Sequence, residues 1–547
     1  MGACGAKISS HSAIIKRMRV LLLVLLLALC ANAGFFDSKI GQKIKETLSK
    51  MKAALNGTAL VAIREKFNNL KEKIKAKLTL SPARKAILDE ILKHIKFIKR
   101  DKVQEKGYSI EEINENSNIG ELLYQGDIVL TDKQAKEIVQ DIESSDSDRE
   151  KRQAFRDRTY PKTLWSKGVY YYFHYNATPE VKSVFKKGAN LWMKDTCIDF
   201  FESQSAPDRI RVFKEDGCGS YVGRLGGQQD LSLGDGCESV GTAAHEIGHA
   251  IGFFHTQSTH DRDNFITFNA HNVKEIEQAY EKDNFQRDWL DQFTKQTPAT
   301  NENYGITYDY GSIMHYGANS ATGNGRPTMV PHDPKYVETL GSPIISFSEL
   351  LMLNTHYGCT RLFQGICKFS FLPAGCGAVY QASTQYQTFH DEVGNKAAGQ
   401  RPREDMDFCY YWITAPQGSR IEIKIAGLSR GASVDGCQHW GVEIKTHADQ
   451  RLTGYRFCAP EDVGTTLVSS SNIVLIITYN RFFATAVDIQ YRIVSGGGGG
   501  NPMPQPTNCV DNAQCATIVR TKDFCHNRAF TDSIRRGLCP KACGFCR

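Results

Sequence analysis

Cysteine is missing from a long N-terminal stretch of this 547-residue chain. None occurs between Cys30 and Cys197, whereas 15 of the 17 cysteines lie from Cys197 onwards. The stretch before Cys197 therefore folds without disulfides. The cysteine content of the rest is typical of an oxidising compartment, where cysteines form bridges instead of redox thiols. Because 15 is odd, one of these cysteines is left over.

Long apolar runs are also scarce. The best candidate, Val20–Leu29, follows three basic residues and is too short to span a bilayer comfortably. Small residues at 31–33 complete the pattern of a secretory signal cut after Ala33. We therefore expect residues 1–33 to be removed, and the protein to be secreted and extracellular with no membrane anchor.

Strong charge of one sign is absent. The net charge of +7 is mild for this length, and no platform of arginines and aromatics favours a nucleic-acid partner. A hydrophobic content of 41% and a charged content of 23% are ordinary for globular proteins and exclude wholesale disorder. The length predicts two to four domains.

Residues 34–152 have the features of a helical pro-segment. Lysine-rich stretches carry apolar residues at helical spacing, among them Ile87, Ile91, Ile95 and Ile98. Such helices can also lie on membranes, but a soluble segment with a solvated lysine face is favoured. In SSDSDREKRQAF, the basic pair ending at Arg152 predicts activation cleavage by a furin-like protease, the alternative being a solvated charge cluster.

The remaining chain divides by composition. Residues 153–360 mix strand and helix patterns, as in an α+β enzyme domain. Residues 376–494 contain short β runs, such as RIEIKIAG, NIVLIITYN and AVDIQYRIV, that suit a β-sandwich. Residues 495–507 form a Gly/Pro linker. Residues 508–547 hold six cysteines in a module too small to fold without them.

The stretch TAAHEIGHAIGFFHT at 242–256 holds three histidines. His245 and His249 are four residues apart, so on a helix they lie one turn apart on the same face. His255 can join them only if the chain turns, and Gly252 allows this because glycine readily takes the left-handed conformation that ends a helix. The spacing predicts three ligands for one zinc ion.

Three protein ligands leave a fourth zinc position for water, which is typical of a catalytic site. Glu246 is placed to take a proton from that water and later pass it to a leaving amine. A bare H-E-x-x-H occurs by accident on helices, and a lone histidine is more often structural. The full H-E-x-x-H-x-x-G-x-x-H strongly favours a zinc protease.

Two further stretches, DRDNFI at 261–266 and SIMHY at 312–316, accompany this motif. Together the three closely resemble the astacin family of metzincin endopeptidases, from about residue 153 to 359. The resemblance implies His245, His249 and His255 as zinc ligands and Glu246 as catalytic base. It also implies Met314 as the floor of the site, Tyr316 as a fifth ligand that swings away to stabilise the oxyanion, and the disulfides Cys197–Cys359 and Cys218–Cys237.

Family members often inhibit themselves through an aspartate in an aromatic-x-Gly-Asp motif. LYQGDIVLT places Asp127 in such a motif, upstream of the basic cleavage site, so we expect Asp127 to act as a zinc switch in a latent proenzyme. The alternative is a plain turn before a strand. Many relatives carry a glutamate after the third histidine that pairs with the mature N-terminus. Thr256 stands there and cannot carry that charge.

The C-terminal segments resemble accessory modules. A CUB domain is resembled by the stretches CGAVYQAS, FCYYWITAP and YRFCAP. The resemblance implies the disulfides Cys376–Cys409 and Cys437–Cys458. CUB domains in some cases bind Ca²⁺, but the sequence does not identify ligands for that ion here. Residues 361–375 are a reduced EGF-like or linker segment whose Cys367 is the leftover thiol. The tail resembles a ShKT module common in nematode proteins, with an Asp511–Lys541 salt bridge and the implied pairs Cys509–Cys546, Cys515–Cys539 and Cys525–Cys543.

The resulting expectation is a multidomain secreted zinc metalloendopeptidase with an α+β metzincin catalytic domain. Its expected substrates are extracellular proteins, including cuticle, eggshell or matrix proteins. N-glycosylation acceptors occur at Asn56 and Asn176. The alternative is an extracellular binding or adaptor protein that acts through its CUB and ShKT modules, for which loss of Glu246 or of a ligand would have argued.

Overall fold

The computed structural model describes four parts of the chain. We call them the N-terminal segment (63–143), the central domain (160–359), the β-sandwich domain (376–494) and the C-terminal module (509–546). Residues 1–33, the linker 495–507, Arg152, Asn56 and Cys367 lie outside the described residues. The described ranges are 63, 66–67, 69–102, 105–117, 119–120, 123–143, 154–155, 160–274, 289–297, 301–359, 376–494, 509–527 and 530–546.

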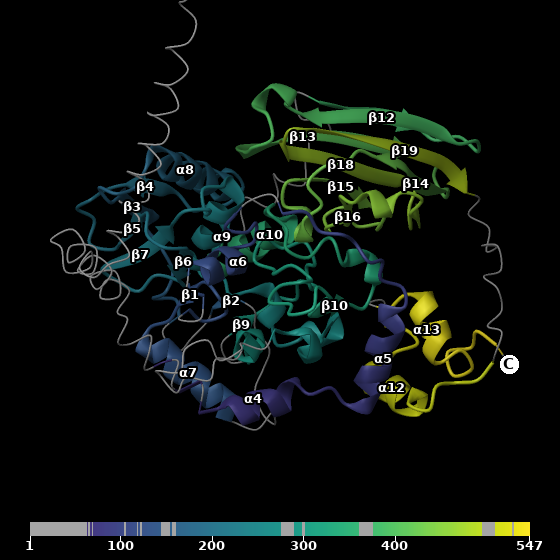
Figure 1. Cartoon of the computed structure of the whole chain (residues 1–547), viewed down its shortest axis with the longest axis horizontal. Coiled ribbons are helices and arrows are strands. Elements are labelled where there is room, and N and C mark those ends of the chain that lie inside the picture. The colour runs from purple at the N-terminus through teal and green to yellow at the C-terminus, as the bar shows by residue number, and fades with distance from the viewer. Residues whose placement is uncertain are drawn as a thin grey trace, which may run out of the picture. The chain divides into compact units, whose positions relative to one another are not determined.

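A six-stranded sheet in the order β1-β6-β7-β5-β3-β4 organises the central domain (Figure 1). Strand β6 runs antiparallel to β7, and the other neighbouring pairs are parallel. The edge strand β1 comes from the N-terminal segment. The strands are β1 (Ile128–Val129), β3 (Val169–Phe173), β4 (Phe200–Glu202), β5 (Arg209–Phe213), β6 (Cys218–Tyr221) and β7 (Gln228–Leu233).

Two helices pack against each other beside this sheet, α8 (Pro179–Lys194) and α9 (Val240–Ala250). Thr178 is the N-cap of helix α8, and its hydroxyl accepts a hydrogen bond from the Val181 nitrogen. Gly188 lets the helices approach closely, since a Cβ there would lie 3.0 Å from the Ala244 nitrogen. Smaller elements complete the domain: β8 (Ile266–Phe268) with β10 (Met329–Pro331), β9 (Asn301–Glu302) with β2 (Ala154–Phe155), and α10 (Phe347–His356).

The N-terminal segment contains α4 (Lys71–Leu78), α5 (Pro82–Leu92), α6 (Ile110–Asn116) and α7 (Asp132–Glu143). The expectation of one helix carrying Ile87 to Ile98 is wrong beyond Leu92, where α5 ends. Lys96 and Arg100 form hydrogen bonds to the β-sandwich domain, and these tertiary contacts override the helical spacing of Ile95 and Ile98.

The β-sandwich domain has two sheets, β11-β13-β18-β15-β16 and β12-β19-β14-β17, which form its two layers (Figure 1). Their facing side chains form a continuous apolar core around Trp440 and Tyr479. The strands expected from RIEIKIAG, NIVLIITYN and AVDIQYRIV are all present. The strands are β11 (Gly377–Gln381), β12 (Gln387–Gly394), β13 (Pro402–Thr414), β14 (Arg420–Leu428), β15 (Trp440–Lys445), β16 (Tyr455–Phe457), β17 (Thr466–Val468), β18 (Ile473–Phe482) and β19 (Ala484–Val494).

The C-terminal module consists of two short helices, α12 (Cys515–Lys522) and α13 (Asp532–Leu538), and three disulfides. The expected Asp511–Lys541 ion pair is replaced by a different contact. The Asp511 carboxylate accepts hydrogen bonds from the backbone N–H groups of Lys541 and Ala542, which leaves the lysine ammonium exposed to solvent. None of the described helices combines the length and the apolar composition that a membrane crossing demands.

Seven disulfides are present among the described residues, and each joins cysteines of one part of the chain. They are Cys197–Cys359, Cys218–Cys237, Cys376–Cys409, Cys437–Cys458, Cys509–Cys546, Cys515–Cys539 and Cys525–Cys543.

A buried ion pair in the β-sandwich domain gives a stability prediction. Glu443 on β15 contacts the Nε of Arg456 at 2.9 Å, and both side chains are almost fully buried. Although burial alone would raise the pKa of Glu443, the charges of Arg456 and Lys445 lower it from 4.5 to about 2. We expect Glu443→Gln to lower the local free energy of unfolding at neutral pH by roughly 3 kcal/mol, because Arg456 keeps an uncompensated buried charge.

Hydrogen exchange of the β15 and β16 amides in the full chain measures this loss. Because the folded pKa is depressed, the contribution of Glu443 is present above pH 4.5 and disappears as the pH falls towards 2. Glu422→Gln, which removes a partner of the more exposed Arg492, is the matched control and is expected to change stability by less than about 1 kcal/mol. Equal protection in the two variants would contradict the prediction.

Candidate metal centre and active site

Helix α9 carries the first two predicted ligands and the predicted base. The hydroxyl of its N-cap, Ser239, accepts a hydrogen bond from the Thr242 nitrogen at 3.0 Å. The helix ends at Ala250, and Gly252 takes a φ of +119°, as its place in the motif predicts. The chain then turns back and brings His255 to the other two histidines.

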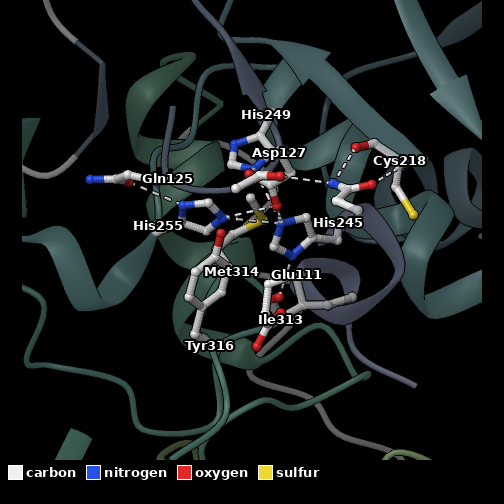
Figure 2. A network of polar contacts seen from close by, with 12 residues as sticks. Glu111, Gln125, Asp127, Cys218, His245, His249, His255, Ile313, Met314 and Tyr316 are labelled. Atoms are coloured by element: carbon white, nitrogen blue, oxygen red, sulfur yellow. Dashed lines mark hydrogen bonds and ion pairs between the residues drawn. The ribbon is translucent and has the colours of Figure 1, made fainter. Parts of the chain in front are cut away.

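The imidazoles of the three histidines converge (Figure 2). The Nε2 atom of His245 lies 3.1 Å from that of His249 and 3.3 Å from that of His255. Tetrahedral zinc ligands at about 2.0–2.1 Å from the ion are roughly 3.3 Å apart, so this spacing fits a zinc ion.

The outer nitrogen of each ring fixes its tautomer. The Nδ1 atoms of His245 and His249 lie 2.7 Å from the carbonyl oxygens of Ile313 and Phe253. A carbonyl only accepts hydrogen bonds, so both Nδ1 atoms carry the proton. The Nδ1 of His255 likewise donates to the side-chain oxygen of Gln125 at 3.1 Å. In the neutral rings, all three Nε2 atoms therefore present lone pairs to the same point, as metal ligation requires.

Asp127 lies at this same point. One of its carboxylate oxygens is 3.0 Å from the His245 Nε2 and 3.2 Å from the His255 Nε2, and the other is 3.5 Å from the His249 Nε2. All four side chains are buried. Lone pairs and a carboxylate repel one another unless a cation lies between them, so the donor set fits a divalent ion with an affinity for nitrogen and oxygen, such as Zn²⁺.

Asp127 reaches the histidines through an unusual backbone turn. Gln125 and Gly126 have φ values of +49° and +82°, and a Cβ on Gly126 would lie 2.7 Å from the Tyr316 hydroxyl oxygen. Asn114 on α6 holds the turn, because its side chain donates to the Gly126 carbonyl at 2.8 Å and to the Cys218 carbonyl at 2.7 Å. The next residues form β1 on the edge of the central sheet.

Glu246 follows the first ligand and is completely buried. Neither of its carboxylate oxygens has a hydrogen-bond partner among the described residues. Burial and the negative charge of Asp127 raise its pKa well above the ordinary value.

Two residues of SIMHY line the site. Met314 lies below α9, where Gly248 makes room for it: a Cβ on that glycine would lie 2.6 Å from the methionine sulfur. The Tyr316 ring packs on His255 with 4.5 Å between centroids. Its hydroxyl is buried against Gly126 and has no hydrogen-bond partner among the described residues.

Thr256 takes part in a buried network without a basic group. Its hydroxyl donates to the Ser312 hydroxyl at 2.7 Å, and Ser312 donates to Glu349 at 2.5 Å. Glu349, on α10, also accepts a hydrogen bond from the Met314 nitrogen. The carboxylate next to the methionine turn thus comes from another helix and holds that turn in place.

Two other residues noted in the sequence, Arg262 and Asn176, form hydrogen bonds to backbone carbonyls. Arg262 of DRDNFI is buried and donates to the Gln257 carbonyl at 2.8 Å. The Asn176 side-chain nitrogen donates to the Lys214 carbonyl at 2.7 Å. Sequence reasoning missed Asn114 and Gln125, because no local motif marks either of them.

Gly126→Ala is expected to weaken the placement of Asp127, because alanine at this positive φ is strained and its Cβ collides with Tyr316. We expect residues 123–130 to become more susceptible to hydrogen exchange by about tenfold, which corresponds to roughly 1.4 kcal/mol. Gly418→Ala is the matched control, since it also has a positive φ but open space around it, and it should leave these residues unchanged. Unchanged exchange in Gly126→Ala would contradict the prediction.

The family model for the astacin peptidases matches residues 157–358. Zinc metalloproteinase nas-31 of Caenorhabditis elegans is 40% identical over 477 residues, which cover 80% of this chain and 76% of the relative. The chain belongs to the astacin family. A second relative in the same organism, zinc metalloproteinase nas-29, is 30% identical over 443 residues, 72% of this chain and 80% of its own length.

Among solved structures, the astacin chain is similar to high choriolytic enzyme 1, a hatching enzyme zinc-protease from the medaka fish Oryzias latipes. The two are 28% identical with a TM-score of 0.31, and the match covers 38% of this chain and 94% of that chain. Family membership makes this astacin a zinc metalloendopeptidase with Zn²⁺ as its cofactor and proteins as its substrates. Family membership thus supports the enzyme over the alternative of an adaptor protein.

Proposed function

We propose that this astacin is secreted as a latent proenzyme in which the N-terminal segment blocks the zinc site through Asp127. The observation that carries the proposal is the carboxylate of Asp127 among the three Nε2 atoms, at 3.0 to 3.5 Å. Cleavage after Arg152 would free the central domain from this carboxylate. The disulfides of all three later parts of the chain support an oxidising, extracellular destination.

His245, His249 and His255 would hold the zinc ion, which polarises a water molecule and the scissile carbonyl when bound. Glu246 then takes a proton at its carboxylate and hands it to the leaving amine. Departure of Asp127 would remove the smaller of the two causes that raise the pKa of Glu246, and departure of the N-terminal segment would open the site to water, which lessens the larger cause, burial. The Tyr316 hydroxyl, which has no partner among the described residues, can donate a hydrogen bond to the oxyanion.

The edge of the central sheet supplies a place for the substrate backbone. In the latent chain β6 pairs with β1, and the Ser220 nitrogen donates to the Asp127 carbonyl at 3.2 Å. Departure of β1 would leave the edge of β6 open to an extended substrate peptide. The β-sandwich domain, as a CUB domain, and the C-terminal module, as a ShKT module, would recruit matrix, cuticle or eggshell proteins.

Hydrolysis of a quenched fluorescent protein substrate tests the proposal. We expect activity from the Arg152-cleaved enzyme, little from the uncleaved chain, and none from either after treatment with a zinc chelator. Metal content is measured in parallel, because zinc in the purified protein should fall when two of the three histidines are replaced. Equal activity of cleaved and uncleaved chains would contradict latency, and full activity without zinc would contradict the assigned chemistry.

A further inference from the structure

Arg100 of the N-terminal segment is held between two other parts of the chain. Its guanidinium donates to both carboxylate oxygens of Glu338 in the central domain, at 3.1 and 2.5 Å. It also donates to Asp435 in the β-sandwich domain at 3.2 Å and to the Val434 carbonyl at 3.3 Å. The two carboxylate side chains are 1% and 9% exposed, so this is a buried contact.

The residues around Arg100 lie along the β-sandwich domain by backbone and side-chain contacts. The Asp101 nitrogen donates to the Ser433 carbonyl at 2.9 Å, and the Ser433 nitrogen donates back to the Asp101 carboxylate at 3.0 Å. The Lys96 ammonium donates to the Glu461 carbonyl and to the Thr465 hydroxyl, both at 2.9 Å. The β-sandwich domain thus binds both the backbone and the basic side chains of a non-helical stretch.

Acidic side chains outnumber basic ones around Arg100. Asp462 is also buried, and burial together with the charge of Glu338 raises its pKa to about 7. Burial likewise raises the pKa of Asp435 to about 6, although Arg100 opposes the shift. We call Glu338, Asp435 and Asp462 the acidic junction. Under the proposed function, Arg100 leaves with the N-terminal segment, and the junction then presents its carboxyl groups without the guanidinium that pairs with them.

The acidic junction borders the active site. The Asp435 carboxylate accepts a hydrogen bond from the Asn319 nitrogen at 2.7 Å, and a Cβ on Gly317 would collide with it. Gly317 directly follows Tyr316, and a cavity of about 290 Å³ is lined by Arg100, Gly317 and Asp435 among others. A peptide bound at the junction would therefore lie next to the cleft.

We propose that the acidic junction of the mature enzyme is a docking site for an arginine-bearing, extended segment of the protein substrate, which Arg100 fills in the latent chain. The inference rests on the proposed function, because the site opens only when the N-terminal segment departs. Arginine is favoured over lysine, since a planar guanidinium can bind Glu338 through two nitrogens and still reach Asp435 and a carbonyl. Specificity would then depend in part on substrate residues beyond the scissile bond.

The test uses a fluorescent peptide with the sequence of residues 94–102 and the Arg152-cleaved enzyme freed of its N-terminal segment. We expect binding in fluorescence anisotropy, a loss of at least about tenfold in affinity for the Arg100→Gln peptide, and a smaller loss for Arg100→Lys. The Lys99→Gln peptide is the matched control, because Lys99 is exposed and its loss removes the same charge. Since these changes are in the peptide, enzyme misfolding cannot produce them.

Two further readouts complete the test. The peptide should slow cleavage of an arginine-containing protein substrate but not of a short fluorogenic peptide, and Asp435→Asn enzyme should bind the peptide at least about tenfold more weakly. Equal affinity for the Arg100→Gln and Lys99→Gln peptides, or no binding at all, would overturn the inference. Peptide binding by an enzyme that fails to hydrolyse any substrate would instead contradict the proposed function and leave the docking site standing.

Discussion

Glu246→Gln in the Arg152-cleaved enzyme is expected to lower kcat/KM by roughly 10²–10⁴, the usual contribution of a general base. Glutamine keeps the size of the side chain but cannot take a proton. The proposed base is fully buried and directly follows the first predicted zinc ligand, and among the described residues Asp127 is the only acidic residue grouped with the three histidines. Steady-state hydrolysis of a fluorogenic peptide measures the loss.

The zinc content of Glu246→Gln is the control for this prediction. It should equal that of the wild type, because Glu246 is not grouped with the three histidines and Asp127 around the expected zinc position. Glu349→Gln provides a second comparison. It alters a buried glutamate that supports the methionine turn, and it should change stability more than the chemical step. Activity of Glu246→Gln within about tenfold of wild type, at full zinc content, would remove Glu246 from the role of base.

Asp127→Ala is expected to give the uncleaved chain an activity at least about 100-fold above that of the uncleaved wild type. Removing one partner of a buried charged contact costs roughly 3–5 kcal/mol, and each 1.4 kcal/mol shifts the balance between blocked and open forms about tenfold. In this chain the lost contacts are those to three histidines at 3.0 to 3.5 Å. Hydrolysis by uncleaved protein, verified by gel to be intact, is the measurement.

Asp132→Asn is the matched control for Asp127→Ala. It removes the same charge from the same segment, but its partners Lys66 and Lys136 are at the surface. Such pairs contribute about 0–1 kcal/mol, so latency should be preserved. If both variants stayed as inactive as the uncleaved wild type, the block would have to come from the other contacts of the N-terminal segment.

Local spacing was enough to predict the centre of the site. The helix that carries His245 and His249, the turn at Gly252 and the return of His255 all follow from residues that are close in sequence. The structure also brings Asp127 to the histidines, 118 residues from His245, which the sequence suggested only through a resemblance. The strands β14, β18 and β19 of the β-sandwich domain follow from local pattern in the same way.

Contacts between distant residues were beyond such reasoning. Gln125 fixes the tautomer of His255, and Asn114 holds the turn before Asp127, but neither has a sequence signature. The end of α5 at Leu92 was mispredicted because the isoleucine spacing continues, whereas hydrogen bonds from Arg100 and Lys96 to residues 334 and 365 positions away decide the conformation. In each of these cases a tertiary partner outweighs the local preference.

The lack of cysteine in residues 34–152 determines how the N-terminal segment can separate from the rest of the chain. The disulfides of the described residues lie within the central domain, the β-sandwich domain and the C-terminal module. Because residues 34–152 contain no cysteine, no disulfide ties them to the remainder. Under the proposed latency, hydrolysis of one peptide bond after Arg152 would therefore change the segment from an inhibitor within the chain into a separate molecule. The separate segment would then rebind only as far as its concentration allows. Within one chain the effective concentration of the segment is high, so its contacts are fully formed, whereas dilution after cleavage would break them.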